Sequence, residues 1–113
     1  MRAAFRFIRH NCSGGYDVDV SLEAVPASAG SCSFAAEVGP GLDAEQQRAV
    51  LAGVQSAAAA SPAPPVRVQV TRASGAAGKS GPLGFKICAE AAMNCLLGHP
   101  EKAPLPGIPR DEA

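Results

Sequence analysis

The segment from Val66 to Leu97 constrains the fold of this chain more than any other part of the sequence. It opens with an alternating strand pattern in which Val66, Val68 and Val70 share one face. A loop rich in glycine and serine follows, and apolar residues then recur at helical spacing: Phe85, Cys88, Ala92, Cys95 and Leu96. Lys86, Glu90 and Asn94 are expected to lie off this stripe. A strand, a long loop and a helix in this order predict either a nucleotide site or a loop that projects towards a large partner.

Three strands are predicted ahead of the first helix. Alternation of apolar and polar residues indicates strands over Ala3–Arg9 and Tyr16–Val25, joined by a loop at Asn11–Gly15. The second strand carries its acidic residues on one face, where cross-strand ion pairs are possible with the arginines of the first: Arg2, Arg6 and Arg9. A shorter strand is predicted over Cys32–Val38.

The first helix is predicted to begin after Asp43 and to run to about Ala60. Asp43 is a suitable N-cap, and Gln46 three residues later completes a capping box. Five residues are expected to face the core: Val50, Leu51, Val54, Ala57 and Ala58.

The element order β, β, β, α, β, α predicts one domain over residues 1–97. The economical arrangement is an α+β two-layer sandwich, in which a four-stranded sheet is covered by two helices on one face. Residues 98–113 contain four prolines and show no periodicity, so we predict a disordered tail.

The balance of charge limits the possible partners. The 113 residues include ten basic and ten acidic side chains, so the formal net charge is zero. A general nucleic-acid or membrane-surface binder usually carries a basic excess, because Lys and Arg supply its affinity for phosphates. We therefore expect no DNA partner and no membrane partner, although a shape-directed contact with RNA is compatible with this balance.

The cysteines and the amino terminus indicate a cytoplasmic protein. Cys12, Cys32, Cys88 and Cys95 form no CxxC pair, and we interpret them as reduced thiols that fill the core rather than as disulfides or zinc ligands. No segment approaches the roughly 18 consecutive apolar residues of a membrane span. The first ten residues carry positive charge without a following apolar run, which argues against a secretory signal.

The segment Ala73–Ser80, ASGAAGKS, comes closest to a nucleotide-binding motif. Gly78, Lys79 and Ser80 match the end of a phosphate-binding P-loop, whose glycines let backbone N–H groups surround the phosphates. Ala73, however, occupies the place of the first glycine, and Pro82 follows where the motif needs a helix N-terminus. A small nucleotide-binding protein with a degenerate P-loop is therefore an alternative, and we expect no bound cofactor.

Two further groups of residues have a simpler explanation than catalysis. Asp17 and Asp19 share one strand face, where paired carboxylates are more often a solvated surface opposite arginines than an acid–base pair. His10 and Cys12 lie close in sequence, but no acidic residue is identified that would orient the imidazole. We predict no catalytic residue and no metal ligand, and we do not expect an enzyme.

Four segments, in order, resemble domain IV of translation elongation factor G and related ribosomal translocases. They are FIRHNCSGGYDVDVSLEAVP, CSFAAEV, VRVQVTRASG and GFKICAEAAMNCLL, and the resemblance covers about residues 5–97. It implies a split β-α-β sandwich with an unusual left-handed crossover. The chain departs from the family in having no GTPase domain, so we expect a stand-alone domain without the GTPase activity of the full factors.

The resemblance further implies a contact with RNA. In the parent factors this domain reaches into the ribosomal decoding centre through its tip loops, which match Asn11–Gly15 and Ser74–Gly84 here. We therefore predict a non-catalytic module that contacts the ribosome or structured RNA. The residues expected to make that contact are Arg9, His10, Arg72, Lys79 and Ser80. A protein–protein module, such as a homodimer through a sheet edge or the Ala-rich helix, is a second alternative that the neutral charge favours.

Overall fold

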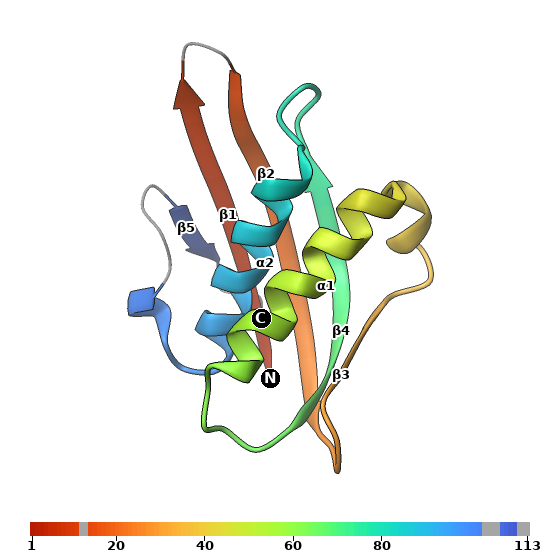
Figure 1. Cartoon of the computed structure of the whole chain (residues 1–113), viewed down its shortest axis with the longest axis vertical. Helices are drawn as coiled ribbons and strands as arrows, with labels where there is room; N and C mark the ends of the chain where they lie inside the picture. The colour runs from red at the N-terminus through yellow and green to blue at the C-terminus, as the bar shows by residue number, and fades with distance from the viewer. Residues whose placement is uncertain (12–13, 103–106, 111–113) are drawn as a thin grey trace.

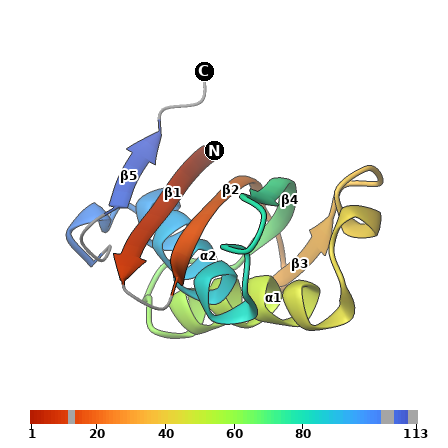
Figure 2. The same cartoon turned by 90° about the horizontal axis from the view of Figure 1, so that it is seen from above.

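The structure, a computed structural model, describes residues 1–11, 14–102 and 107–110. It contains one five-stranded sheet with two α-helices packed on one face (Figures 1 and 2). The strands are β1 (Arg2–Asn11), β2 (Gly14–Pro26), β3 (Ser31–Phe34), β4 (Val66–Gly75) and β5 (Gly107–Arg110). The helices are α1 (Ala44–Ala59) and α2 (Pro82–Leu96). The predicted α+β two-layer sandwich is confirmed.

The strands are ordered β3-β4-β2-β1-β5 across the sheet. All neighbours are antiparallel except β3 and β4, which are parallel and connected through α1. In Figure 1 the helices lie in front of the sheet, and the chain steps leftwards from β3 at the right-hand edge to β4. A parallel connection with this geometry is left-handed, as the resemblance to elongation factor G domain IV implies and against the usual right-handed rule.

Two segments differ from the predicted elements. The third strand ends at Phe34 rather than Val38. Ala35 N makes the last hydrogen bond to β4, to the carbonyl of Val70 at 3.0 Å, and the chain turns after it. The tail predicted to be disordered contains β5, which pairs with β1 and gives the sheet a fifth strand. A proline is tolerated in β5 because an edge strand has one row of backbone groups without a ladder partner.

The core lies between the sheet and the helices. Three of the four phenylalanines are almost completely buried there, together with the apolar faces of β2 and β4: Phe5, Phe7, Phe85, Val18, Val20, Leu22, Val68 and Val70. Nine of the fifteen residues of α2 are buried, because this helix packs against the sheet and α1 at once. For this reason Asn94, predicted to face outwards, is buried.

Helix α1 contacts the core through a narrower face than predicted. Val50, Val54 and Ala57 are buried as expected, whereas Leu51 is half-buried and Ala58 is exposed. Gly53 is buried instead, at the place where α1 lies against the backbone of α2. Alanine and glycine allow the two helices to approach closely, so the contact face depends on small residues that an apolar pattern does not single out.

Substitution of Asp43 tests the capping box at the start of α1. The Asp43 side chain accepts a hydrogen bond from Gln46 N at 2.8 Å, and Gln46 Oε1 accepts one from Asp43 N at 3.0 Å. We expect Asp43→Ala to lower the free energy of unfolding by about 1 kcal/mol, because it leaves N–H groups of the first turn without a partner. Asp43→Asn keeps an oxygen acceptor and should lose much less. Equal losses for both variants in urea denaturation would contradict this role.

Candidate nucleic-acid interface

The two predicted loops lie at the same end of an elongated molecule. The principal extents are 44 × 31 × 26 Å, and the β1–β2 hairpin and the loop between β4 and α2 both project at one end of the longest axis (Figure 1). We call this end the tip and define it as Arg9–Asn11, Gly14–Asp17 and the segment Ala76–Gly84. Loops far apart in the sequence are therefore brought together where the resemblance places an RNA contact.

Backbone hydrogen bonds fix the second loop against β2. Asp17 N donates to the carbonyl of Lys79, and Ala76 N donates to the carbonyl of Asp17, both at 2.9 Å. The loop is shorter than the predicted Ser74–Gly84, because β4 continues to Gly75 and α2 begins at Pro82. The Ala76–Gly81 loop includes Gly78 at a φ of +74°, a backbone conformation that favours glycine. The loop is a compact turn rather than a long projecting arm.

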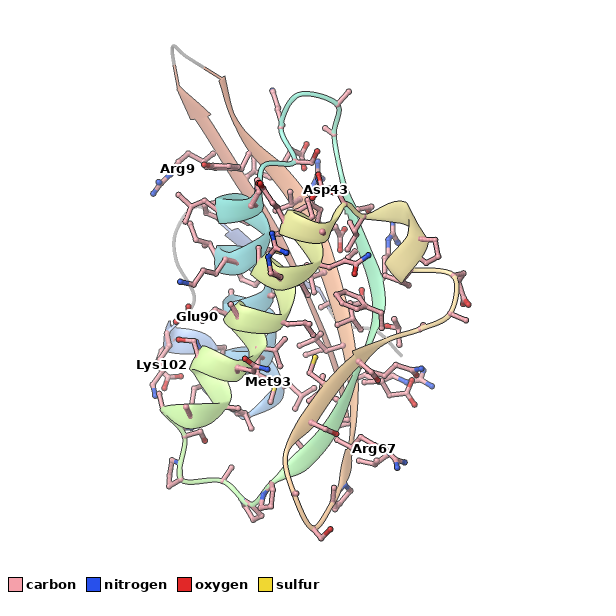
Figure 3. All side chains as sticks on the ribbon, turned by 45° about the vertical axis from the view of Figure 1, so that its right-hand side comes forward. Arg9, Asp43, Arg67, Glu90, Met93 and Lys102 are labelled. Carbon is pink, nitrogen blue, oxygen red and sulfur yellow. The ribbon has the colours of Figure 1, made fainter. Side chains whose placement is uncertain are left out.

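An aromatic contact joins the hairpin to the start of α2. The Tyr16 ring packs on Gly84, where a β-carbon would overlap it, and stacks on Phe7 with 6.0 Å between ring centroids. The guanidinium carbon of Arg9 lies 5.7 Å from the centroid of the Phe7 ring. This stack orients Arg9 on the helix side of the sheet, where its side chain is exposed (Figure 3).

The structure brings most of the predicted contact residues to the tip. Arg9 is exposed there, and Lys79 and Ser80 are half-buried in the second loop. The Ser80 carbonyl accepts a hydrogen bond from Gln46 Nε2 at 2.8 Å, which ties the loop to the start of α1. The backbone of His10 lies opposite Gly15 in the hairpin, while its side chain is outside the described part of the structure.

The acidic face of β2 turns away from the helices and is paired with β1. Arg6 binds Asp17 through two hydrogen bonds of 3.0 Å each, and these bonds raise the pKa of Arg6. Arg2 lies 3.7 Å from Glu23 on the same face. The predicted ion pairs are thus confirmed for Arg2 and Arg6. For Arg9 the prediction is wrong, because residues two apart share a strand face and Arg9 follows Phe5 and Phe7.

A β-bulge places Arg72 on the helix-free face, where it lines a concavity with the tip residues Asp17 and Ala76. The register of β2 and β4 shifts between Ser21 and Leu22, which leaves Thr71 as the extra residue. Thr71 Oγ1 donates to the carbonyl of Ser21 at 3.3 Å. Beyond the bulge, Arg72 and Ser74 point away from the helices and line a shallow polar concavity of about 300 Å³ with Arg6, Asp17 and Asp19. The break in alternation at Thr71 and Arg72 was the sequence signal for this bulge.

The P-loop-like segment does not form a phosphate cradle. Ala73–Gly75 belong to β4 and pair with β2, so the first three of the eight residues of the segment are strand. Ala76 N and Lys79 N donate to carbonyls of the protein itself. A phosphate site needs successive backbone N–H groups that face one anion, and this geometry does not favour it.

The described cysteines and acidic residues form neither an activated thiol nor a metal-binding cluster. Burial raises the pKa of Cys88 to about 12 and that of Cys32 to about 11, which keeps both thiols protonated at neutral pH. Cys88 Sγ also donates to the carbonyl of Phe5 at 3.0 Å. Among these residues no three His, Cys, Asp or Glu side chains converge to hold a metal ion. No helix in the same ranges is long and apolar enough to cross a membrane.

These features define an α+β domain of the split β-α-β type with two loops joined at one tip. A crystal structure of a protein from Thermus thermophilus superimposes on 96% of this chain with a TM-score of 0.67 and 22% sequence identity. The chain spans 16% of the length of that protein. No protein-family model and no curated protein matches the sequence. At this identity the likeness shows the fold alone.

Proposed function

We propose that this chain is a cytoplasmic, non-catalytic, translation-factor-like module that contacts the ribosome or another structured RNA through its tip. One observation carries the proposal: Asp17, in the strand that leaves the first loop, holds the second loop beside it through two backbone hydrogen bonds of 2.9 Å. These are the loops that the resemblance matches to the RNA-contacting loops of elongation factor G domain IV. Two neighbouring loops at one end of an elongated molecule suit insertion into a folded RNA, which proteins recognise largely by shape.

The distribution of charge supports the same proposal. The net charge of the chain is zero, but the main acidic strand face is turned to the helix-free side and paired with arginines. Arg9 and Lys79 lie at the tip, and exposed Lys86 follows in the second turn of α2. A few basic residues at such a tip are enough to position it on phosphates without general affinity for nucleic acid.

Co-sedimentation with ribosomes and separated subunits at increasing salt tests this proposal. We expect binding that weakens with salt, and we expect Arg9→Ala and Lys79→Ala each to reduce the logarithmic salt slope by about 1. Arg67→Ala is the matched control, because Arg67 is an exposed strand arginine near the opposite end of β4 (Figure 3). It should leave binding unchanged.

Three results would contradict the proposal. The first is no binding at low salt, and the second is an equal loss for Arg67→Ala and the two tip variants. The third is a rise in melting temperature on addition of ATP or GTP, which would indicate nucleotide binding at the Gly78–Ser80 segment instead. Self-association without ribosome binding would favour the homodimer alternative.

A further inference from the structure

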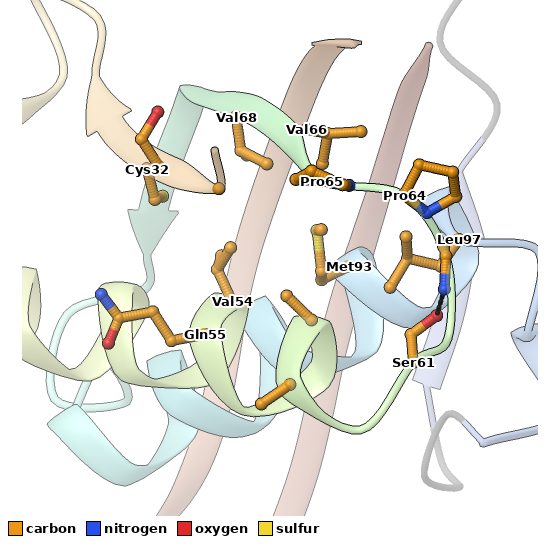
Figure 4. Close-up of a pocket in the computed structure, with 15 residues that line it drawn as sticks. Cys32, Val54, Gln55, Ser61, Pro64, Pro65, Val66, Val68, Met93 and Leu97 are labelled. Atoms are coloured by element: carbon orange, nitrogen blue, oxygen red, sulfur yellow. Dashed lines mark hydrogen bonds between the residues drawn. The ribbon is translucent and has the colours of Figure 1, made fainter. Parts of the chain in front are cut away.

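An apolar pocket lies between the sheet and the two helices, lined by residues far from the tip (Figure 4). Its volume is about 360 Å³. Five segments contribute to its wall: β3, β4, α1, the end of α2 and the proline-rich segment that links α1 to β4. The volume falls within the range of roughly 300–1,000 Å³ that is typical of small-molecule sites.

The floor of the pocket belongs to the core, and its rim consists of small residues. Val54 and Val68 are each 2% exposed and Met93 is 0% exposed, and their side chains face the same space (Figure 4). Around the opening the chain carries small residues such as Ala58 and Ala63. The hollow therefore arises from side chains that are too short to close the gap between α1 and the sheet.

The side chains of the pocket wall disfavour a charged ligand. Of the fifteen residues that line the pocket, all in the described part of the chain, none has a charged side chain. An ion placed here would lose its hydration without gaining a partner, which is unfavourable. Gln55 is the largest polar side chain of the wall, and its exposed amide can donate to or accept from one polar group.

The proline-rich part of the rim offers few backbone groups to an extended peptide. Pro64 and Pro65 have no N–H, and the carbonyl of Pro65 already accepts from Ala27 N at 3.2 Å. The hydroxyl of Ser61 accepts from Ala63 N at 3.2 Å. Peptides that bind in extended form rely on main-chain hydrogen bonds for affinity, so the pocket suits a compact ligand better.

We propose that this pocket binds a small, uncharged, apolar molecule whose apolar part contacts the half-buried Val66 and Leu97 above the buried floor, with one polar group directed to Gln55. Burial of apolar surface in a preformed hollow drives such binding. The site is distant from the tip and does not depend on its function.

Methyl NMR on the full chain, labelled with ¹³C at the methionine methyl groups, tests the pocket directly. The chain has two methionines, so two signals are expected: Met93 on the pocket floor and Met1, which is 61% exposed. The probes are 2-naphthol and naphthalene-2-sulfonate, which share a ring system and differ in charge. We expect 2-naphthol to shift the Met93 signal saturably and leave the Met1 signal in place. The sulfonate should bind at least about tenfold more weakly.

Two substitutions of alanine by phenylalanine separate pocket binding from non-specific adsorption. Ala58→Phe places a ring at the opening, at an exposed helix position that should tolerate it, and is expected to weaken 2-naphthol binding by about tenfold or more. Ala60→Phe, at the exposed C-cap of α1 outside the pocket wall, should leave binding unchanged. An unshifted Met93 signal, equal binding of the sulfonate, or full binding to Ala58→Phe would overturn the proposal. So would binding only of a leucine-bearing peptide, which would assign the pocket to a protein partner.

Discussion

Replacement of Phe85 by alanine is expected to lower the free energy of unfolding by about 3–5 kcal/mol. Phe85 is 1% exposed and packs between α2 and the sheet, in a core with few other large side chains. Its removal loses the transfer free energy of the ring and leaves a cavity that the neighbouring alanines cannot fill. Domains of this size are stable by only about 5–15 kcal/mol, so the variant should unfold at much lower urea concentration.

Phe34 provides the control within the same residue type. It is half-buried on β3, the short edge strand, so Phe34→Ala removes less buried surface. Phe85→Leu should lose less than Phe85→Ala, because it keeps most of the apolar volume. Urea denaturation followed by circular dichroism measures all three variants. If Phe85→Ala were no less stable than Phe34→Ala, the core would not depend on the Phe85 ring.

Gly53→Leu is expected to lower the free energy of unfolding by about 3 kcal/mol or more. A β-carbon at Gly53 would overlap the carbonyl oxygen of Lys86 and lie 2.9 Å from Glu90 N. Both atoms belong to the backbone of α2, so no side-chain rotation relieves the overlap and the helices must separate. Gly53→Ala should also destabilise the fold, although the better helix propensity of alanine offsets about 1 kcal/mol of the loss.

Ser56→Leu is the matched control for this contact, because Ser56 is exposed on the same helix. It adds a similar side chain without touching α2 and should change stability by no more than about 0.5 kcal/mol. Urea denaturation again provides the measurement. Comparable losses at positions 53 and 56 would mean that the effect comes from the helix itself rather than from the contact between the helices.

Local sequence signals were sufficient for most of the fold. Alternation located β1, β2 and β4, and Asp43 with Gln46 located the start of α1 to within one residue. These signals depend on neighbours a few residues apart, so one sequence contains them. Strand β5 was missed because its pairing with β1 joins residues about a hundred positions apart, and a short proline-containing segment carries no alternation. The left-handed crossover was accessible only through the resemblance.

The candidate sites show the same difference between features that depend on nearby residues and features that depend on distant segments. The two tip loops were identified in advance, since glycines and element boundaries mark them, and Arg9 and Lys79 lie there. The strand face on which Arg72 lies did not follow from alternation, because a single extra residue in β4 exchanges the two faces. The apolar pocket was not anticipated at all. It is formed by short side chains that leave space between segments distant in the sequence, and a local sequence pattern cannot predict such a space.

The order of the strands also determines when each part of the sheet can be completed during synthesis. Strand β3 is made before β4 but forms its ladder only with β4, so it has no strand partner until α1 and β4 have both emerged. The β1–β2 hairpin can pair at once, whereas the outer edge of β1 is covered only when Gly107–Arg110 arrives. Until then the outer edge of β1 is open to other chains, and an uncovered edge strand is a site for association between chains.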